Sequence, residues 1–341
     1  MKQLLIHIGT HKTGTTAIQN ALRANRKLLA QNGCAYVDEA YELSRRLKEP
    51  GLAGSEFAAV KNTFNDLVNR VSGNRVIFSS EQFAGTILKN YTDSSFIAER
   101  LKDIFPEYSI SVIVYFRRQD RFIESAYVQF IQQGQPWSFD RFRDFADFSK
   151  FDWNIVVDNY RQYFQSVDIH IYDRSQLTGS DVVTDFFSWL DLPVDRRLRI
   201  IRGSNYSFSR TAVEIARVGN DYLDDTAKQL LCVILQSRDS RQPYDDNPYF
   251  SMQERKALLV HYRAANQKLA VATGADLEEP FPRIPAGDPQ GMESTIMAVD
   301  TDAAVRLLID ICLEQHYVPW YRTMGGLLGR LNNKLKQYIP W

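Results

Sequence analysis

The segment from Leu4 to Leu22, LLIHIGTHKTGTTAIQNAL, passes from one hydrophobic pattern to another. Its first residues, Leu4–Ile8, form a continuous apolar run interrupted by one histidine, which is typical of a strand buried on both faces. From Thr15 to Asn32 the apolar residues recur at helical spacing, and Gly33 follows as a stop signal. The segment therefore predicts a buried strand, a tight loop and a helix.

Four later segments repeat the pattern of a short buried strand between helical stretches. They are CAYV (34–37), RVIFSSE (75–81), ISVIVYFRR (110–118) and VDIHIYD (167–173). Strands that alternate with helices favour a parallel sheet with right-handed crossovers. We therefore predict an α/β fold with a P-loop-type parallel β-sheet flanked by helices.

The pattern becomes mostly helical after about Leu192. Helices are predicted near 209–220, 225–237, 252–272 and 302–315, with a Pro- and Gly-rich linker, EEPFPRIPAGDPQG, at 278–291. The chain ends in a basic amphipathic tail with leucines at four-residue spacing. We predict a single domain over 1–341, in which 1–192 form the α/β core and 193–341 a helical extension.

Composition excludes several classes of protein. The 41 basic and 41 acidic residues balance, so overall charge indicates no nucleic-acid partner. The three cysteines indicate neither a disulfide framework nor a zinc cluster, and His170, His261 and His316 stand apart from other ligands, so we predict no metal. The sequence shows no secretion signal and no bilayer-spanning apolar run, which predicts a cytoplasmic protein.

The loop after the first strand has the features of an anion site. Gly9 and Gly14 have the separation of the two glycines of a P-loop, and the helix that starts near Thr15 directs its N–H groups and dipole to the same point. Phosphate is the expected anion. An ATP- or GTP-hydrolysing loop places its lysine directly after the second glycine. Here Thr15 occupies that position, and Lys12 lies inside the loop.

The segment HKTGTT (11–16) resembles the 5′-phosphosulfate-binding loop of sulfotransferases that use 3′-phosphoadenosine 5′-phosphosulfate (PAPS). The resemblance implies that Lys12 binds near the oxygen that bridges phosphorus and sulfur. It also implies that the backbone from Thr13 through Gly14 to Thr16, with the hydroxyls of Thr15 and Thr16, holds the 5′-phosphate. A lysine in this place suits a donor with one 5′-phosphate and a sulfuryl group.

The strand ISVIVYF (110–116) is followed by RRQDRFIESAYVQF, which resembles the second motif of the same family. In that motif an arginine at the strand end and a serine eight residues later contact the 3′-phosphate, and Arg117 and Ser125 have this spacing. Arginine at such an edge offers a bidentate fork to phosphate. Because Arg118-Gln119 replace the family's usual Asn-Pro or Asp-Pro, Arg118 is the alternative contact.

A third segment, RGSNYSFS (202–209), resembles a donor-covering loop of the family. The resemblance implies that Arg202 and Gly203 cover the donor. In the alternative interpretation, Ser207 or Ser209 only caps the helix that follows.

Sulfuryl transfer to an alcohol requires a base for the acceptor proton. Glu81 follows a predicted strand, as the catalytic glutamate does in similar carbohydrate sulfotransferases, although the residues after it match only in part. Glu81 as a simple helix-start charge is the alternative. His11, beside Lys12, is the competing base, and His7 is expected to be a hydrogen-bonded core residue.

The acceptor is predicted from weaker signals. The resemblance to bacterial relatives implies a glycan, and Trp137, Phe139 and Arg143 are candidates for an acceptor wall unless they pack a helix. If the glycan is lipid-linked, the basic tail would contact the membrane surface; otherwise the tail packs on its own domain. Two other hypotheses are a P-loop kinase or NTPase and a non-catalytic PAPS-binding module.

Overall fold

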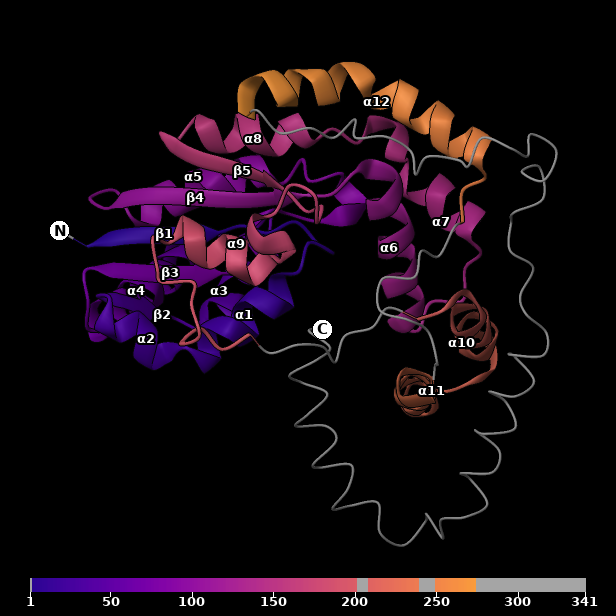
Figure 1. Cartoon of the computed structure of the whole chain (residues 1–341), viewed down its shortest axis with the longest axis horizontal. Coiled ribbons are helices and arrows are strands. Elements are labelled where there is room, and N and C mark those ends of the chain that lie inside the picture. The colour runs from indigo at the N-terminus through magenta and orange to yellow at the C-terminus, as the bar shows by residue number, and fades with distance from the viewer. Residues whose placement is uncertain (1, 201–207, 239–248, 274–341) are drawn as a thin grey trace, which may run out of the picture. The chain divides into compact units, whose positions relative to one another are not determined.

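Strand β1 (Gln3–His7) lies in the middle of a five-stranded sheet in which every neighbouring pair is parallel. The computed structural model describes residues 2–200, 208–238 and 249–273, and Figure 1 shows the sheet with helices around it. The strand order is β2-β3-β1-β4-β5. The other strands are β2 (Cys34–Tyr36), β3 (Arg75–Ser79), β4 (Ser109–Phe116) and β5 (Ser166–Ile171). The predicted α/β fold and its five strands are confirmed.

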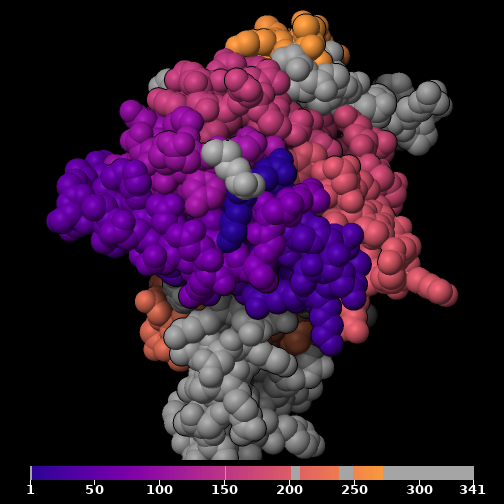
Figure 2. Space-filling view, turned by 90° about the vertical axis from the view of Figure 1, so that its left-hand side faces the viewer, coloured from indigo at the N-terminus to yellow at the C-terminus, as the bar shows by residue number. Residues whose placement is uncertain are grey.

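The central place of β1 decides which loops meet. Leu5 of β1 is in register with Ile77 of β3 on one side and Ser111 of β4 on the other. In the space-filling view, the indigo residues at the start of the chain lie between later, purple segments (Figure 2). Because parallel strands end at one edge, the loop after β1 is flanked by the segments that follow β3 and β4.

One face of the sheet carries helices α1 (Thr15–Ala24), α2 (Arg26–Gln31) and α9 (Val182–Trp189). Their shared core contains Leu5, Ile77 and Tyr115 from the strands, packed with apolar side chains of these helices. Because successive side chains of a strand point to opposite faces, the residues next to these three in each strand point to the other face of the sheet.

The opposite face is covered by α4 (Gly54–Arg70), α5 (Ser94–Ile104) and α8 (Trp153–Arg161). Phe78 of β3 meets Phe64 of α4 edge to face at 5.7 Å between ring centroids, and Phe116 of β4 stacks on Trp153 of α8 at 4.7 Å. With helices on both faces, strands can be apolar along their whole length, which is the pattern that the sequence shows.

The single helix predicted over Thr15–Asn32 is wrong, because the chain breaks at Asn25 between α1 and α2. The buried Asn25 amide donates to the carbonyl of Ala21 at 2.8 Å and to that of Arg199 at 2.9 Å. Its side-chain oxygen accepts from the N–H of Arg199 at 2.9 Å. The helix is therefore interrupted at Asn25, whose side chain instead makes a pair of hydrogen bonds with the distant Arg199.

The remaining α-helices of the described chain are α3 (Ala40–Arg46), α6 (Gln119–Gln132), α7 (Phe139–Ala146), α10 (Arg210–Tyr222), α11 (Asp225–Arg238) and α12 (Met252–Thr273). Among them, the three predicted near 209–220, 225–237 and 252–272 are confirmed as α10, α11 and α12. None of the described helices combines the length and apolar composition that crossing a bilayer requires. The predicted linker, the helix at 302–315 and the basic tail lie outside the described residues.

The chain divides into two compact units. The first comprises residues 1–127, 137–205 and 248–296, and the second 128–136, 206–247 and 297–341. The described part of the first unit holds the whole sheet and α12. In the second unit, the Asn220 amide of α10 donates to the carbonyls of Ile131 and Gln135, at 2.8 and 3.0 Å. The single domain predicted over 1–341, with its core ending at 192, stays a prediction.

Candidate functional site

The loop between β1 and α1 is curled and pinned to the sheet. Lys12 and Gly14 both have left-handed backbone angles, with φ of 65° and 81°. Residues of this kind turn successive backbone N–H groups toward a common point. The hydroxyl of Thr13 donates to the carbonyl of Thr10, and that of Thr10 to the carbonyl of Tyr115, each at 2.6 Å. The loop is therefore held in a curled conformation against the sheet.

Helix α1 begins at the end of this loop. Gly14 is its N-cap, and the first helical hydrogen bonds run from Ala17 and Ile18 to the Gly14 carbonyl. Within the described residues, the backbone amides of 13–16 donate no hydrogen bond. Unused amides and the positive end of a helix dipole together form a site for an anion.

Two buried side chains beside the loop have an atom without a partner. Among the described residues, neither Nε2 of His7 nor Oγ1 of Thr15 takes part in a hydrogen bond. Both atoms face Gly9, because a Cβ added there would lie 2.6 Å from that Nε2 and 2.5 Å from that Oγ1. Buried polar atoms normally have partners, so these two unpartnered atoms beside Gly9 are exceptions at the start of the loop.

His7 is fixed by its other ring nitrogen. Nδ1 lies 2.8 Å from Oγ of Ser79 on β3, which confirms the predicted hydrogen-bonded core histidine. Burial lowers the pKa of His7 to about 3, so its ring is neutral at physiological pH. A neutral ring beside an anion site adds a hydrogen-bonding group without a charge.

Arg117 is connected to the loop through Tyr172. The guanidinium of Arg117 lies over the Tyr172 ring, 5.8 Å from its centroid. A Cβ added to Gly14 would lie 3.0 Å from Cε2 of the same ring. The backbone N–H of Tyr172 also donates to the Phe116 carbonyl at 2.6 Å. The structure thus brings the two sequence motifs to one aromatic side chain.

Arg118, the alternative phosphate ligand, is engaged in a buried ion network. Its guanidinium donates to both carboxylate oxygens of Asp120, at 2.7 and 2.9 Å. Asp120 also pairs with Arg255 of α12, and Arg255 pairs with Glu124 at 2.7 Å. This network holds the start of α6 in place. The guanidinium of Arg118 is therefore committed to Asp120, whereas that of Arg117 lies over Tyr172 beside the loop.

Ser125 lies on α6, nearly two turns after Gln119. It is half-buried, and its hydroxyl makes no hydrogen bond with the described part of the chain. The hydroxyl is therefore available to a ligand.

Glu81 starts a short 3₁₀-helix (Glu81–Phe83) just after β3. The preceding turn is held by the hydroxyl of Ser80, which accepts from the N–H of Gln82 at 3.2 Å and from the hydroxyl of Ser44 at 2.8 Å. Burial raises the pKa of the Glu81 carboxyl, and hydrogen bonds and the ammonium of Lys48 partly offset this. A raised carboxyl pKa suits a general base.

His11 is held by Tyr91, which the sequence analysis did not identify. The Tyr91 hydroxyl lies 3.1 Å from Nδ1 of His11 and accepts from its backbone N–H at 3.3 Å. Burial lowers the pKa of His11 to about 3, with smaller contributions from the positive charges of Lys48 and Lys12. The Glu81 charge in turn acts on Lys48 and Tyr91. The loop and Glu81 therefore belong to one electrostatic site.

Phe139 and Arg143 have structural contacts rather than an exposed wall. Phe139 packs against Tyr127 and Tyr249 at 5.2 and 5.1 Å. Arg143 pairs with Asp140 and Glu254. These two residues therefore follow the helix-packing alternative, whereas Trp137 is partly exposed.

Arg202, Gly203 and Ser207 lie outside the described residues. Ser209 follows the capping alternative, because its hydroxyl accepts from the N–H of Ala212 at 3.2 Å at the start of α10.

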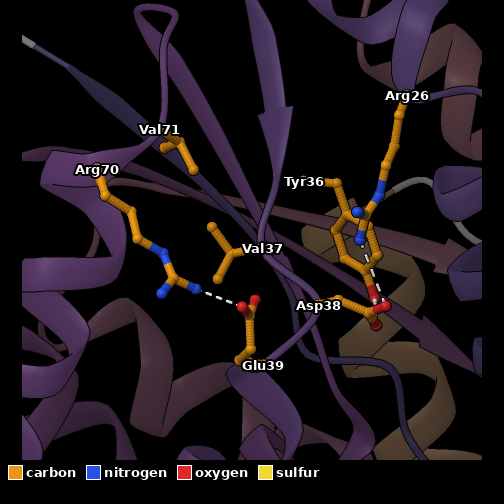
Figure 3. Close-up of a pocket in the computed structure, with 7 residues that line it drawn as sticks. All are labelled: Arg26, Tyr36, Val37, Asp38, Glu39, Arg70 and Val71. Atoms are coloured by element: carbon orange, nitrogen blue, oxygen red, sulfur yellow. Dashed lines mark hydrogen bonds and ion pairs between the residues drawn. The ribbon is translucent and has the colours of Figure 1, made fainter.

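A hollow of about 430 Å³ lies next to edge strand β2, apart from the predicted site residues. Figure 3 shows that its charged side chains face one another. Arg26 pairs with Asp38 at 3.4 Å, and Arg70 pairs with Glu39. Because its charges are mutually satisfied, the hollow does not offer the unpaired groups that the loop offers. Within the described ranges, no three His, Cys, Asp or Glu side chains gather as a metal site.

Comparisons with known proteins find a relative that is similar to this chain over part of its length. No family model matches the chain. An uncharacterized protein of Archaeoglobus fulgidus is 29% identical over 164 residues, which are 46% of this chain and 44% of that protein. The chain thus matches less than half the length of this relative.

Proposed function

We propose that the protein is a PAPS-dependent sulfotransferase that moves a sulfuryl group to a hydroxyl, or an amine, of a glycan. The observation that carries the proposal is the anion site itself. It combines the unused amides of 13–16 with the unpartnered buried hydroxyl of Thr15. Lys12 lies inside this loop, whereas a triphosphate-binding loop carries its lysine directly after the second glycine, where this chain has Thr15.

The donor fits the residues around the loop. Its 5′-phosphate takes the loop amides and the hydroxyls of Thr15 and Thr16, with Lys12 near the bridging oxygen. Its 3′-phosphate takes Arg117, which shares Tyr172 with Gly14, and the hydroxyl of Ser125. This arrangement extends the donor from β1 toward β4, across the point where the chain leaves adjacent strands in opposite directions.

The reaction is an in-line displacement at sulfur. The acceptor oxygen forms a bond to sulfur while the bond from sulfur to the bridging oxygen breaks. Glu81 accepts the acceptor's proton, and Lys12 with the loop amides stabilises the negative charge that grows on the leaving phosphate. The product is 3′-phosphoadenosine 5′-phosphate (PAP). Positioning and electrostatics supply most of the rate enhancement.

Glu81 is preferred to His11 as the base. Nδ1 of His11 is engaged with Tyr91, and the neighbouring lysines oppose the positive charge that a histidine base would acquire. Glu81 becomes neutral on accepting a proton, which burial favours. We assign His11 to the shape of the loop.

The test is transfer of ³⁵S from labelled PAPS to a panel of acidic and neutral glycans. Wild-type protein is expected to label at least one glycan, and Glu81→Gln to lose about 10²–10⁴-fold in rate while it still binds PAP. A wild type that binds PAP but labels no glycan would support the non-catalytic module. A Glu81→Gln variant with full activity would exclude Glu81 as the base.

A further inference from the structure

Lys48 stands out among the basic residues near the loop, because the sequence motifs do not include it. It lies just beyond α3, and with Tyr41 and Ser44 it continues one face of that helix. Ser44 contacts the hydroxyl of Ser80 at 2.8 Å, and the hydroxyl of Tyr41 accepts from the Gln82 amide at 3.4 Å. This face of α3 therefore lies along the segment that carries Glu81.

Among the described residues, the ammonium of Lys48 has no close acceptor. It is half-buried, yet it makes no hydrogen bond or close ion pair with any described residue. Asp93, one nearby carboxylate, is occupied by the N–H and hydroxyl of Thr86 at 2.9 and 2.7 Å. Glu81, the other, interacts with Lys48 through its charge but forms no close ion pair with it. A partly desolvated cation without an anion is costly, so an anionic ligand group would stabilise Lys48.

The position of Lys48 assigns that anion to the acceptor rather than to the donor nucleotide. Strands β3 and β4 lie on opposite sides of β1. Arg117, which we assign to the 3′-phosphate, follows β4, whereas Glu81 follows β3 and α3 packs there. The charge of Lys48 reaches Glu81 and His11, where the acceptor must enter to meet the base.

We propose that Lys48 binds an anionic group of the acceptor, a carboxylate or a sulfate ester, next to the hydroxyl that receives the sulfuryl group. The inference rests on the proposed function, because that function defines the acceptor. It narrows the acceptor class to acidic glycans. The ammonium would donate a charge-assisted hydrogen bond to an opposite charge, and a neutral sugar carries no such charge.

The experiment is ligand-observed NMR titration of the full chain with three probes: methyl glucuronide, glucose 6-sulfate and methyl glucoside. Wild type is expected to bind an anionic probe at least about tenfold more tightly than the neutral one. Lys48→Met is expected to abolish this preference. Lys89→Met is the matched control, because Lys89 is exposed near Lys48, and it should retain the preference.

The three probes identify the anion, and PAP binding distinguishes the Lys48 anion site from the proposed sulfotransferase function. Preference for the glucuronide indicates a carboxylate, and preference for the 6-sulfate a sulfate ester. Equal or absent binding of all three probes by wild type, or a preference that survives Lys48→Met, overturns the inference.

PAP binding by wild type and by each variant is measured by calorimetry. If Lys48→Met also loses PAP, Lys48 belongs to the donor site and the inference fails. If wild type does not bind PAP but its anionic preference needs Lys48, the sulfotransferase proposal fails and the anion site stands.

Discussion

The hydroxyl of Tyr91 holds both the backbone N–H and the ring Nδ1 of His11, at 3.3 and 3.1 Å. Tyr91 is fully buried and has a left-handed backbone with φ of 58°. A strained buried tyrosine that braces a loop residue indicates that the shape of the loop is maintained from outside it.

Tyr91→Phe should therefore loosen the loop. We expect a loss of about 1–2 kcal/mol in the free energy of unfolding, since two part-buried groups of His11 lose their partner. We also expect weaker PAP binding by calorimetry. Tyr163→Phe is the control, because the half-buried Tyr163 makes no side-chain hydrogen bond with the described residues. Equal PAP affinity in wild type and Tyr91→Phe would show that the brace is dispensable.

Gly14→Ala should disrupt the anion site. The φ of 81° is unfavourable for alanine, and the added Cβ would lie 2.9 Å from Cγ1 of Val182. We expect about 1–3 kcal/mol of destabilisation and loss of PAP binding, measured by urea unfolding and calorimetry. Gly51→Ala is the matched control, because nothing lies within 4 Å of its added Cβ. A Gly14→Ala protein that binds PAP like wild type would argue against the proposed loop geometry.

Arg117→Ala and Arg118→Ala should have different effects, the first on PAP binding and the second on the free energy of unfolding. Arg118→Ala removes one partner of the buried Asp120, so we expect a loss of about 1–3 kcal/mol in the free energy of unfolding. Arg117→Ala should abolish PAP binding, whereas Arg118→Ala should retain it. Urea unfolding and calorimetry on both variants give the comparison. The reverse pattern would move the phosphate contact to Arg118.

His7 should make stability depend on pH. Burial lowers the pKa of His7 to about 3 in the folded chain, from 6.5 for an unperturbed histidine. Between these values the unfolded state binds a proton that the folded state does not, so the free energy of unfolding rises with pH. The stability contributed by neutral His7 is fully present above about pH 6.5. It is lost as the pH falls toward 3, at about 1.4 kcal/mol in the free energy of unfolding per pH unit. His7→Gln should reduce the slope of stability between pH 4 and 6 by that amount; an unchanged slope would mean that His7 is protonated in the fold.

The sheet could be predicted from the sequence because each strand carries its own signal. The apolar runs of β1, β3 and β4 are covered on both faces, so burial leaves its full pattern in the residues. The break at Asn25 could not be predicted in this way. Its cause is a pair of hydrogen bonds to Arg199, 174 residues away, and helical spacing continues across the break.

The site residues likewise differ in whether local sequence identifies them. The loop and Arg117 follow strand ends, so local motifs identify them. Tyr91 acts on His11 across 80 residues, and Lys48 reaches the site only because α3 packs along the segment after β3. Such contacts depend on tertiary packing, and a short motif carries no record of them.

Calorimetric titration with PAP tests the central claim most directly. The account predicts that wild-type protein binds PAP tightly without Mg²⁺ and that Arg117→Ala and Lys12→Ala lose this binding. Protein that ignores PAP but binds ATP or GTP in the presence of Mg²⁺ would contradict the sulfotransferase proposal and favour the kinase alternative.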